Sequence, residues 1–393
     1  MRREVPAERG EKERFLLRTV DEVRGVLAAE ADEAETLRTL PASSAAALRD
    51  SGLLALKLPA VLGGAEADPI TQLKVIEAVS YINSAAGWCL FVGAATLGIS
   101  GAFLPDSAIG KIFSGERLPA FAGGGGFALG KMTPADGGYR LTGHWSWGSG
   151  IRHVDWVTVP ARVESGKGAG EVRFCIFPVA QCEIDDNWHV MGLKGTGSCD
   201  YSVTDLFVPE DFTHLEPNAA SPKRGGPLYR IGLPGFIANE NAGFELGVAR
   251  RALDEIVALA QSKQRGYHKK TPLIQRAVFQ RAIGEDDLSL RAARALMIEL
   301  LEDAWKTVCD GGRIEPRTQA ALRSAGSLIM DVSLKAATDA FRYGGSSAIR
   351  SSNILQRCLR DLEAAGTHFI ISDSSYENYG QFLLGLPQAD PMN

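Results

Sequence analysis

Residues 139–156, YRLTGHWSWGSGIRHVDW, are the stretch that decides the fold. Alternate side chains of an extended chain share a face, so a β-strand here would carry five residues on one side: Tyr139, Leu141, Gly143, Trp145 and Trp147. Two tryptophans on one face can pack against a planar ring. The glycines of the Gly148-Ser149-Gly150 turn would let backbone N–H groups and one hydroxyl approach a ligand. A core strand that ends in a glycine turn explains the same residue pattern, so the core strand and the ligand site both stay open as interpretations.

The composition is that of a large globular protein. The chain has 393 residues, of which 45% are hydrophobic, and this is enough for a sizeable core and two or three structural units. The net charge is −5, and the densest basic cluster is the short run at residues 265–270. Nucleic-acid binding needs a basic stripe, so we expect no nucleic-acid partner.

Cysteine and histidine spacing gives no metal or disulfide pattern. The six cysteines lie far apart without a CxxC pair, and the six histidines form no HxxxH or HExxH pair. We therefore expect a reducing, cytoplasmic environment and no catalytic metal. The N-terminus is charged, and no stretch reaches the roughly 18 apolar residues that would span a bilayer. We expect a soluble protein with no membrane partner.

The periodicity predicts three domains of an α+β, mainly α protein. Residues 1–118 have helical spacing, and residues 85–103 are apolar nearly all round, which predicts a helix in the interior or against a partner subunit. Alternation then predicts a β domain at residues 119–227, a sandwich or barrel, with strands at 139–147, 156–163, 172–177 and 201–208. Helical spacing returns in residues 228–393 and predicts a four-helix bundle.

Two common nucleotide-binding signatures fail here. Residues 123–128 match a loose GxGxxA string, but this string does not follow a predicted strand and open a helix, as a dinucleotide fold requires. No Gly-Lys-Ser or Gly-Lys-Thr of a P-loop occurs, and no GxSxG nucleophile elbow occurs. A nicotinamide site within this chain is therefore not expected.

His368 is the strongest candidate for a side chain that handles a proton. It lies near the C-terminal end of CLRDLEAAGTHFIIS, which we interpret as a helix whose apolar residues would lower the pKa of the imidazole. A neutral imidazole can accept a proton. A lone helical histidine is also a common core or interface residue, and that alternative stays open.

Three patches together resemble the acyl-CoA dehydrogenase fold: GHWSWGSGIRHVDW, WHVMGLKGTGSCDYSVTDLFVPED and RYGGSSAIRSSNILQRCLRDLEAAGTHF. The order of helical, β and helical domains is also that of this fold, and the resemblance covers nearly the whole chain. Within the fold the patches look most like oxygenase components of two-component, reduced-flavin-dependent monooxygenases. That group includes p-hydroxyphenylacetate hydroxylase, the actinobacterial steroid-pathway phenol hydroxylase and dibenzothiophene monooxygenase.

Two departures separate the chain from true acyl-CoA dehydrogenases. Those enzymes usually have a catalytic Glu about eight residues after the Arg-Asp pair of the last patch, whereas Arg360-Asp361 is followed there by His368 and Phe369. The Gly-Ser-Asp segment before their central strand is replaced by residues 123–133. An acyl-CoA dehydrogenase or oxidase, with Glu240 or Glu245 as base, is the alternative function. A non-catalytic relative that acts as an assembly partner is a third.

The resemblance also implies roles for individual residues. Ser149 would hydrogen-bond the flavin near N5, with Trp147 and Gly148 beside the ring, and His368 would face the substrate. Arg265, Gly344 and Gly345 would meet the flavin tail across a subunit boundary. Thr196, Gly197 and Ser198 would form a turn near the site without assigned chemistry.

The activity implied by the resemblance is hydroxylation of a small aromatic or phenolic molecule. Reduced FMN or FAD would come from a separate NAD(P)H-flavin reductase and would react with O₂ to give a C4a-hydroperoxide. Members of the family assemble as homotetramers, so we expect the same closed symmetry.

Overall fold

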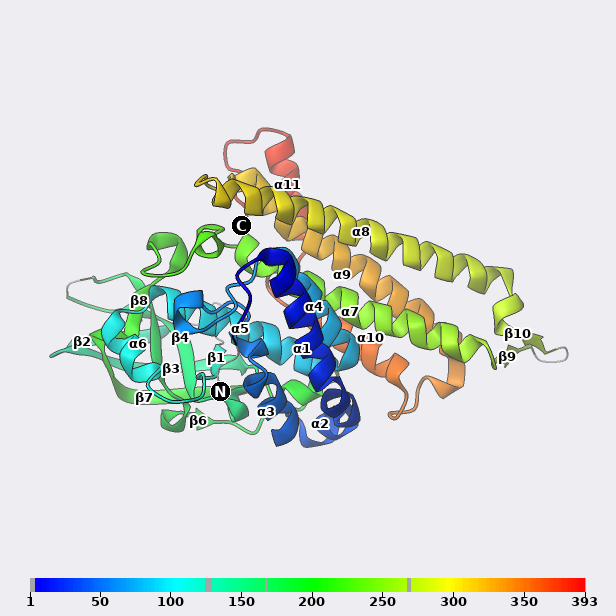
Figure 1. Cartoon of the computed structure of the whole chain (residues 1–393), viewed down its shortest axis with the longest axis horizontal. Helices are drawn as coiled ribbons and strands as arrows, with labels where there is room; N and C mark the ends of the chain where they lie inside the picture. Colours follow the sequence, from blue (N-terminus) through cyan, green and yellow to red (C-terminus); the bar gives the residue numbers. More distant parts are fainter. Residues whose placement is uncertain (1–3, 124–128, 167, 267–269, 393) are drawn as a thin grey trace. The chain divides into compact units, whose positions relative to one another are not determined.

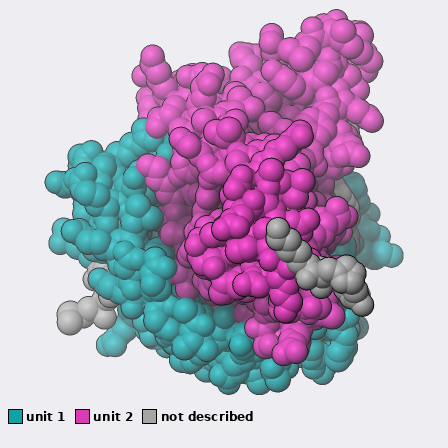
Figure 2. Space-filling model, turned by 90° about the vertical axis from the view of Figure 1, so that its right-hand side faces the viewer, with its two compact units in different colours: residues 1–72, 88–190, 194–233 teal, residues 73–87, 191–193, 234–393 magenta. Residues whose placement is uncertain are grey.

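Figure 1 shows the helices and strands of the chain, which folds into the two compact units coloured in Figure 2. The computed structural model describes residues 4–123, 129–166, 168–266 and 270–392. Unit 1 comprises Met1–Gln72, Trp88–Val190 and Lys194–Leu233, and unit 2 comprises Leu73–Gly87, Met191–Leu193 and Pro234–Asn393. The predicted domain boundaries at residues 118 and 227 stay a prediction.

Within the described residues six α-helices precede the strands: α1 (Arg9–Ala29), α2 (Ala31–Leu37), α3 (Ala42–Asp50), α4 (Pro69–Ile82), α5 (Ser84–Phe103) and α6 (Asp106–Ile112). The side chain of Glu8 begins α1, because its carboxylate accepts the N–H groups of Gly10 and Glu11 at 2.8 and 2.6 Å. Leu16, Val20 and other apolar residues at helical spacing form the buried stripe of α1.

Helix α5 is buried along most of its length, as predicted. Among the described residues it is the one helix long and apolar enough to cross a membrane, and 83% of its most apolar window is buried in the protein. The prediction that no stretch would pass such a test is therefore wrong. Small residues explain the burial: a Cβ added at Gly98 would lie 2.9 Å from the Cβ of Lys57, so the two segments approach closely.

Eight strands of unit 1 form one mixed sheet: β1 (Phe121–Gly123), β2 (Gly130–Ala135), β3 (Gly138–Gly148), β4 (Trp156–Val163), β5 (Val172–Pro178), β6 (Glu183–Ile184), β7 (Cys199–Pro209) and β8 (Thr213–Leu215). Their order is β6-β7-β3-β2-β4-β5-β8, with β1 parallel to β4. The four predicted strands are all present. In the described residues the pairing follows an open path, so the β domain is one mixed sheet.

The core of unit 1 joins this sheet to the helices around it. Trp145, Tyr201 and Met132 of the sheet belong to one buried cluster with Leu97 of α5 and Ile109 of α6. Residues 124–128, which carry most of the GxGxxA string, lie outside the described residues. The strand β1 does precede that string, contrary to prediction, but β2 rather than a helix follows at Gly130.

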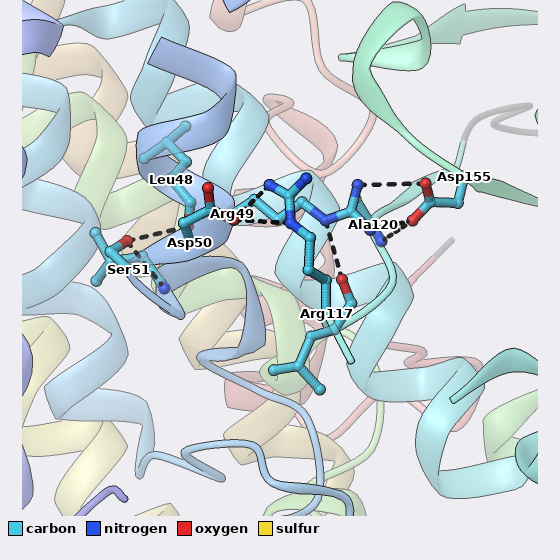
Figure 3. A network of polar contacts seen from close by, with 9 residues as sticks. Leu48, Arg49, Asp50, Ser51, Arg117, Ala120 and Asp155 are labelled. Atoms are coloured by element: carbon cyan, nitrogen blue, oxygen red, sulfur yellow. Dashed lines mark hydrogen bonds and ion pairs between the residues drawn. The ribbon is translucent and has the colours of Figure 1, made fainter. Parts of the chain in front are cut away.

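A polar network fastens α3 to the start of the sheet (Figure 3). Arg49 donates to both carboxylate oxygens of Asp155, at 3.2 and 2.5 Å, and to the carbonyl of Leu118 at 3.0 Å. The same carboxylate accepts the N–H of Ala120 at 3.0 Å. These bonds fix the segments that enter β1 and β4, which pair with each other.

Unit 2 contains the predicted four-helix bundle. Its helices are α7 (Gly235–Ala260), α8 (Ala277–Cys309), α9 (Pro316–Gly344) and α10 (Ile354–Ala365), and they pack against one another. A two-stranded ribbon, β9 (Gln264–Arg265) with β10 (Thr271–Pro272), lies between α7 and α8 in sequence, and α11 (Ser374–Leu383) follows α10 (Figure 1). The mainly helical α+β fold class is confirmed.

Glycines let α7 pack directly on the part of α4 that belongs to unit 2. A Cβ added at Gly247 would lie 2.3 Å from the carbonyl oxygen of Glu77 and 2.9 Å from the Cβ of Ser80. The carboxylate of Glu77 also accepts the guanidinium of Arg294 of α8, at 2.9 to 3.1 Å. The close approach therefore fixes three helices together.

Gly247→Ala should lower the free energy of unfolding by about 1–3 kcal/mol, because the added methyl must push α7 away from α4. Gly284→Ala is the matched control: Gly284 is exposed on α8, with nothing within 4 Å of an added Cβ. This control should raise the stability by about 0.5–1 kcal/mol through helix propensity. Urea denaturation measures both, and equal effects of the two substitutions would contradict the packing.

Candidate functional site

The end of β3 separates its two tryptophans. Trp145 pairs with Tyr201 and Gly148 with Cys199, so β3 has one more residue than β7 between these pairs. This bulge breaks the alternation. Trp145 is fully buried, stacks on Tyr201 at 5.9 Å and donates its indole N–H to the carbonyl of Pro160 at 3.1 Å. Trp147 is 61% exposed, with φ of +66°. The expected pair of tryptophans on one face is therefore wrong, and of these two side chains only Trp147 is exposed.

In the turn after the bulge, the backbone N–H groups of Ser149 and Gly150 donate to carbonyls of the protein. The N–H of Ser149 donates to the carbonyl of Trp147, and that of Gly150 to the carbonyl of Thr196, both at 2.8 Å. The expectation that these two amides reach a ligand is wrong. Gly148 is required by packing, because a Cβ there would lie 2.9 Å from the ring of Tyr201. Gly150 has φ of +73°, a conformation that favours glycine.

The hydroxyl of Ser149 is the polar group that the turn presents. The side chain is 5% exposed, and its oxygen accepts the indole N–H of Trp88 of α5 at 3.0 Å. It also shares a hydrogen bond of 2.7 Å with the hydroxyl of Ser198, which in turn lies 2.7 Å from the hydroxyl of Thr196. A buried serine is thus held by an indole and a chain of hydroxyls.

Sequence reasoning missed Trp88 and gave Thr196 and Ser198 no role. Trp88 lies 61 residues from Ser149 in a helix that is apolar nearly all round. A core tryptophan accounts for that position equally well, so the sequence carries no signal for the contact. The loop before β7 is a Gly-rich turn, and its contact with Ser149 depends on the pairing of β3 with β7.

The imidazole of His368 lies in a turn of unit 2. Helix α10 ends at Ala365, so the predicted placement in a helix is wrong; Gly366 and Thr367 begin the turn. The side chain is half-buried, and burial lowers the pKa of His368 from 6.5 to about 4, as expected. Its Nδ1 lies 3.4 Å from the N–H of Ile370, which is a weak hydrogen bond.

A buried arginine holds this turn. Arg323 of α9 is 4% exposed, and its guanidinium donates to the carbonyls of Ile370 at 3.3 Å and Phe369 at 3.4 Å. It also donates to the carbonyl of Pro391 near the C-terminus at 3.2 Å. The position of His368 is therefore set by α9 and by the C-terminal segment as well as by α10.

Arg265, Gly344 and Gly345 lie together in unit 2. Arg265 is in β9, and its guanidinium donates to the carbonyls of Tyr343 at 2.8 Å and Arg342 at 3.2 Å. A Cβ added at Gly345 would lie 2.2 Å from that guanidinium. The cation thus caps the C-terminal end of α9, where the helix dipole favours positive charge.

Glu240 and Glu245, the alternative bases, are both buried in α7. Neither carboxyl oxygen of Glu245 has a hydrogen-bond partner among the described residues. Burial, with a smaller contribution from Asp331, holds the pKa of Glu245 well above its usual range. Burial therefore favours the neutral form of the Glu245 carboxyl.

The predicted site residues fall into two groups. Trp147, Gly148 and Ser149 lie together in unit 1, and Arg265, Gly344 and Gly345 lie together in unit 2 with His368 elsewhere in the same unit. That both groups meet one flavin stays a prediction. A cavity of about 400 Å³ beside the α3 network is lined by Phe15, Arg49, Arg117 and other residues, none of them a predicted site residue. In the described ranges no three His, Cys, Asp or Glu side chains are grouped to hold a metal.

The residues of unit 1 suit the edge of a flavin ring. Ser149 and Ser198 are almost fully buried, so water does not compete for their hydroxyls. The indole of Trp147 is exposed at the same turn, although large aromatic side chains are usually buried. An aromatic plane beside a shielded hydroxyl can hold a planar molecule whose edge exchanges hydrogen bonds.

Comparison with known proteins supports the resemblance. Residues 241–373 match the family model described as acyl-CoA dehydrogenase, C-terminal domain. An indole-3-acetate monooxygenase of Pseudomonas putida is 28% identical over 339 residues, which cover 86% of each chain. An FADH(2)-dependent resorcinol hydroxylase, oxygenase component, of a Rhizobium species is 28% identical over 399 residues, which cover 94% of this chain and 95% of its own.

A solved structure agrees over nearly the full length. XiaF from a Streptomyces species, in complex with FADH2 and glycerol, superposes with a TM-score of 0.88 at 25% identity and covers 98% of each chain. The chain has the acyl-CoA dehydrogenase-like fold, and over nearly its full length it is similar to the oxygenase components of two-component, flavin-dependent monooxygenases.

Proposed function

We propose that the protein takes reduced FMN or FAD from a separate reductase and uses O₂ to hydroxylate a small aromatic molecule. The names of the two relatives support an aromatic substrate, since indole-3-acetate and resorcinol are both electron-rich rings. The observation that carries the proposal is that the end of β3 and the turn after it bring a buried hydroxyl, Ser149, within two residues of an exposed indole, Trp147. When bound, reduced flavin would supply the electrons that activate O₂.

In this proposal the residues of β3 hold the flavin. The Trp147 indole would pack against the ring, and the Ser149 hydroxyl would bind the N5 edge, as the family resemblance implies. A dry environment limits the loss of O₂-derived oxidant as hydrogen peroxide, and the burial of Ser149 and Ser198 supports such an environment. Arg265 with Gly344 and Gly345 would bind the flavin tail.

His368 would act on the substrate. Its imidazole stays neutral at pH 7 because burial lowers its pKa to about 4. A neutral imidazole can orient a phenolic hydroxyl or accept its proton, which raises the electron density of the ring that is attacked. The protein would assemble with further copies of itself into a homotetramer, and it would work in the cytoplasm.

Acyl-thioester dehydrogenation receives less support. That reaction needs an ionised carboxylate to remove an α-proton, and His368 occupies the usual position of the base. Burial raises the pKa of Glu245, which disfavours the ionised form that such a base needs.

Anaerobic titration with flavin tests the proposed function. Photoreduced FMN and FAD should quench the fluorescence of the protein at lower concentration than the oxidised forms, because the enzyme works on reduced flavin delivered by another protein. An acyl-CoA added to the oxidised complex should leave its yellow colour unchanged. The proposal would be overturned if the protein bound flavin in neither redox form, or if the acyl-CoA bleached the bound oxidised flavin.

The pKa of His368 sets a pH dependence. Product formation at saturating reduced flavin should stay constant from pH 8 to about 5, and should fall only as His368 becomes protonated near its pKa of about 4. The free energy of unfolding should decrease as pH falls from 6.5 toward 4, because the unfolded chain binds the proton first. An inflection of product formation near pH 6.5 that is absent from His368→Gln would contradict this assignment.

A further inference from the structure

The hydrogen bonds of Ser149 leave one position of its hydroxyl unused. A serine hydroxyl has one hydrogen to donate and two lone pairs that accept. The indole N–H of Trp88 can only donate, so it occupies one lone pair of Ser149 permanently. The bond to Ser198 occupies either the hydrogen or the second lone pair, because either oxygen can be the donor. The remaining position is therefore a donor in one arrangement and an acceptor in the other.

The neighbouring hydroxyls allow both arrangements. Thr196, Ser198 and Ser149 form a line with two contacts of 2.7 Å. If hydrogens point from Thr196 toward Ser149, then Ser149 accepts twice and its own hydrogen points away from the line. If hydrogens point the other way, Ser149 donates to Ser198 and keeps one lone pair for another donor. Rotation of three hydroxyls, with no movement of heavy atoms, changes one arrangement into the other.

Burial makes this line act as a unit. Thr196 is 0% exposed, Ser198 2% and Ser149 5%, so bulk water does not compete for the hydrogen bonds within the line. Hydrogen bonds in such chains polarise one another, which couples the direction of one hydroxyl to the next. The fixed Trp88 donor keeps the Ser149 oxygen in place while its hydrogen changes direction.

We propose that Trp88, Ser198 and Thr196 are positioning residues, a relay that lets the Ser149 hydroxyl serve both redox states of the flavin. The inference rests on the proposed function, in which Ser149 binds the N5 edge. N5 of oxidised flavin is an acceptor, and N5–H of reduced flavin is a donor. The relay gives Ser149 an outward hydrogen that can be donated to N5 of oxidised flavin. It gives Ser149 an outward lone pair that can accept the N5–H of reduced flavin.

Ser198→Ala should shift the redox preference of binding. Without Ser198 the Ser149 hydrogen has no inner acceptor and must point outward, which suits oxidised flavin and opposes the N–H of reduced flavin. The ratio of the dissociation constants, oxidised over reduced, should fall about tenfold, the value of one hydrogen bond. Anaerobic titration of each variant with oxidised and photoreduced FMN and FAD measures this ratio without turnover.

Two further variants keep the test decisive. Thr196→Val removes the hydroxyl that contacts Ser198 at nearly constant volume, and it should shift the ratio in the same direction by a smaller factor. Ser202→Ala, on β7 but outside the relay, is the matched control and should leave both affinities unchanged. Thermal unfolding of each variant checks that the fold is intact.

The outcomes separate the relay from the proposed function. Suppose that the wild-type protein binds reduced flavin, but that Ser198→Ala and Thr196→Val keep the wild-type ratio of dissociation constants. The relay is then wrong while the proposed function stands, and the same holds if both variants lose affinity for the two redox forms by the same factor. If wild type binds neither form, the proposed function itself fails. A ratio that falls in both relay variants, with Ser202→Ala unchanged, supports the relay.

Discussion

His368→Ala should lower the rate of product formation by about a hundredfold or more, the usual contribution of a positioned acid or base, while the affinity for reduced flavin stays unchanged. The side chain lies in a turn that Arg323 holds from α9, so its removal leaves the backbone bonds of the turn in place. Its pKa of about 4 keeps the imidazole neutral, which is the form that can act on a substrate hydroxyl. Reduced flavin would then be consumed mainly to form hydrogen peroxide.

Turnover with a panel of phenols and indoles, with product and peroxide measured together, gives this result. His368→Gln tests the interpretation further, because its amide can orient a hydroxyl but cannot take a proton at neutral pH. His144→Ala is the control, since His144 is exposed on β3 and pairs with Asp185. Unchanged product formation by His368→Ala would remove this residue from the reaction.

Ser149→Ala should lower the yield of product per reduced flavin by about tenfold, and hydrogen peroxide should rise by the matching amount. The substitution leaves the indole N–H of Trp88 and the hydroxyl of Ser198 without their shared partner in a buried place. It also removes the one side-chain hydroxyl that the turn after β3 can present to a ring. The affinity for both redox forms of flavin should fall.

Ser149→Thr distinguishes chemistry from packing, because it restores a hydroxyl at the same position. Recovery of the product yield in Ser149→Thr, but not in Ser149→Ala, would assign the effect to the hydroxyl. A wild-type ratio of product to peroxide in Ser149→Ala would contradict the assigned role. The thermal unfolding of both variants should be measured as well, because unpaired buried groups also destabilise the fold by about 1–3 kcal/mol.

Local periodicity predicted most of the fold. The apolar helix α5 and the strand β4 lie where hydrophobic spacing placed them, because burial against a core repeats at the period of each element. The four-helix bundle of unit 2 follows from the same rule. Such patterns depend only on which side of an element is buried, and a single sequence contains that information.

The site was less predictable because it depends on contacts between distant segments. The bulge that exposes Trp147 comes from the register of β3 against β7, and strict alternation along β3 gives no sign of it. The hydrogen bond from Trp88 to Ser149 joins a helix to a turn 61 residues away. His368 lies beyond the end of α10 because the helix ends at Ala365, a boundary that periodicity places only within a few residues.

The most direct test of the central claim follows an oxygen atom. Chemically reduced FMN or FAD, the purified protein, an aromatic substrate from the panel and isotopically labelled O₂ are mixed without a reductase, and the product is weighed by mass spectrometry. The account predicts a hydroxylated product that carries one labelled oxygen and forms only when reduced flavin is present. A product without the label, or the same product with oxidised flavin, would contradict it.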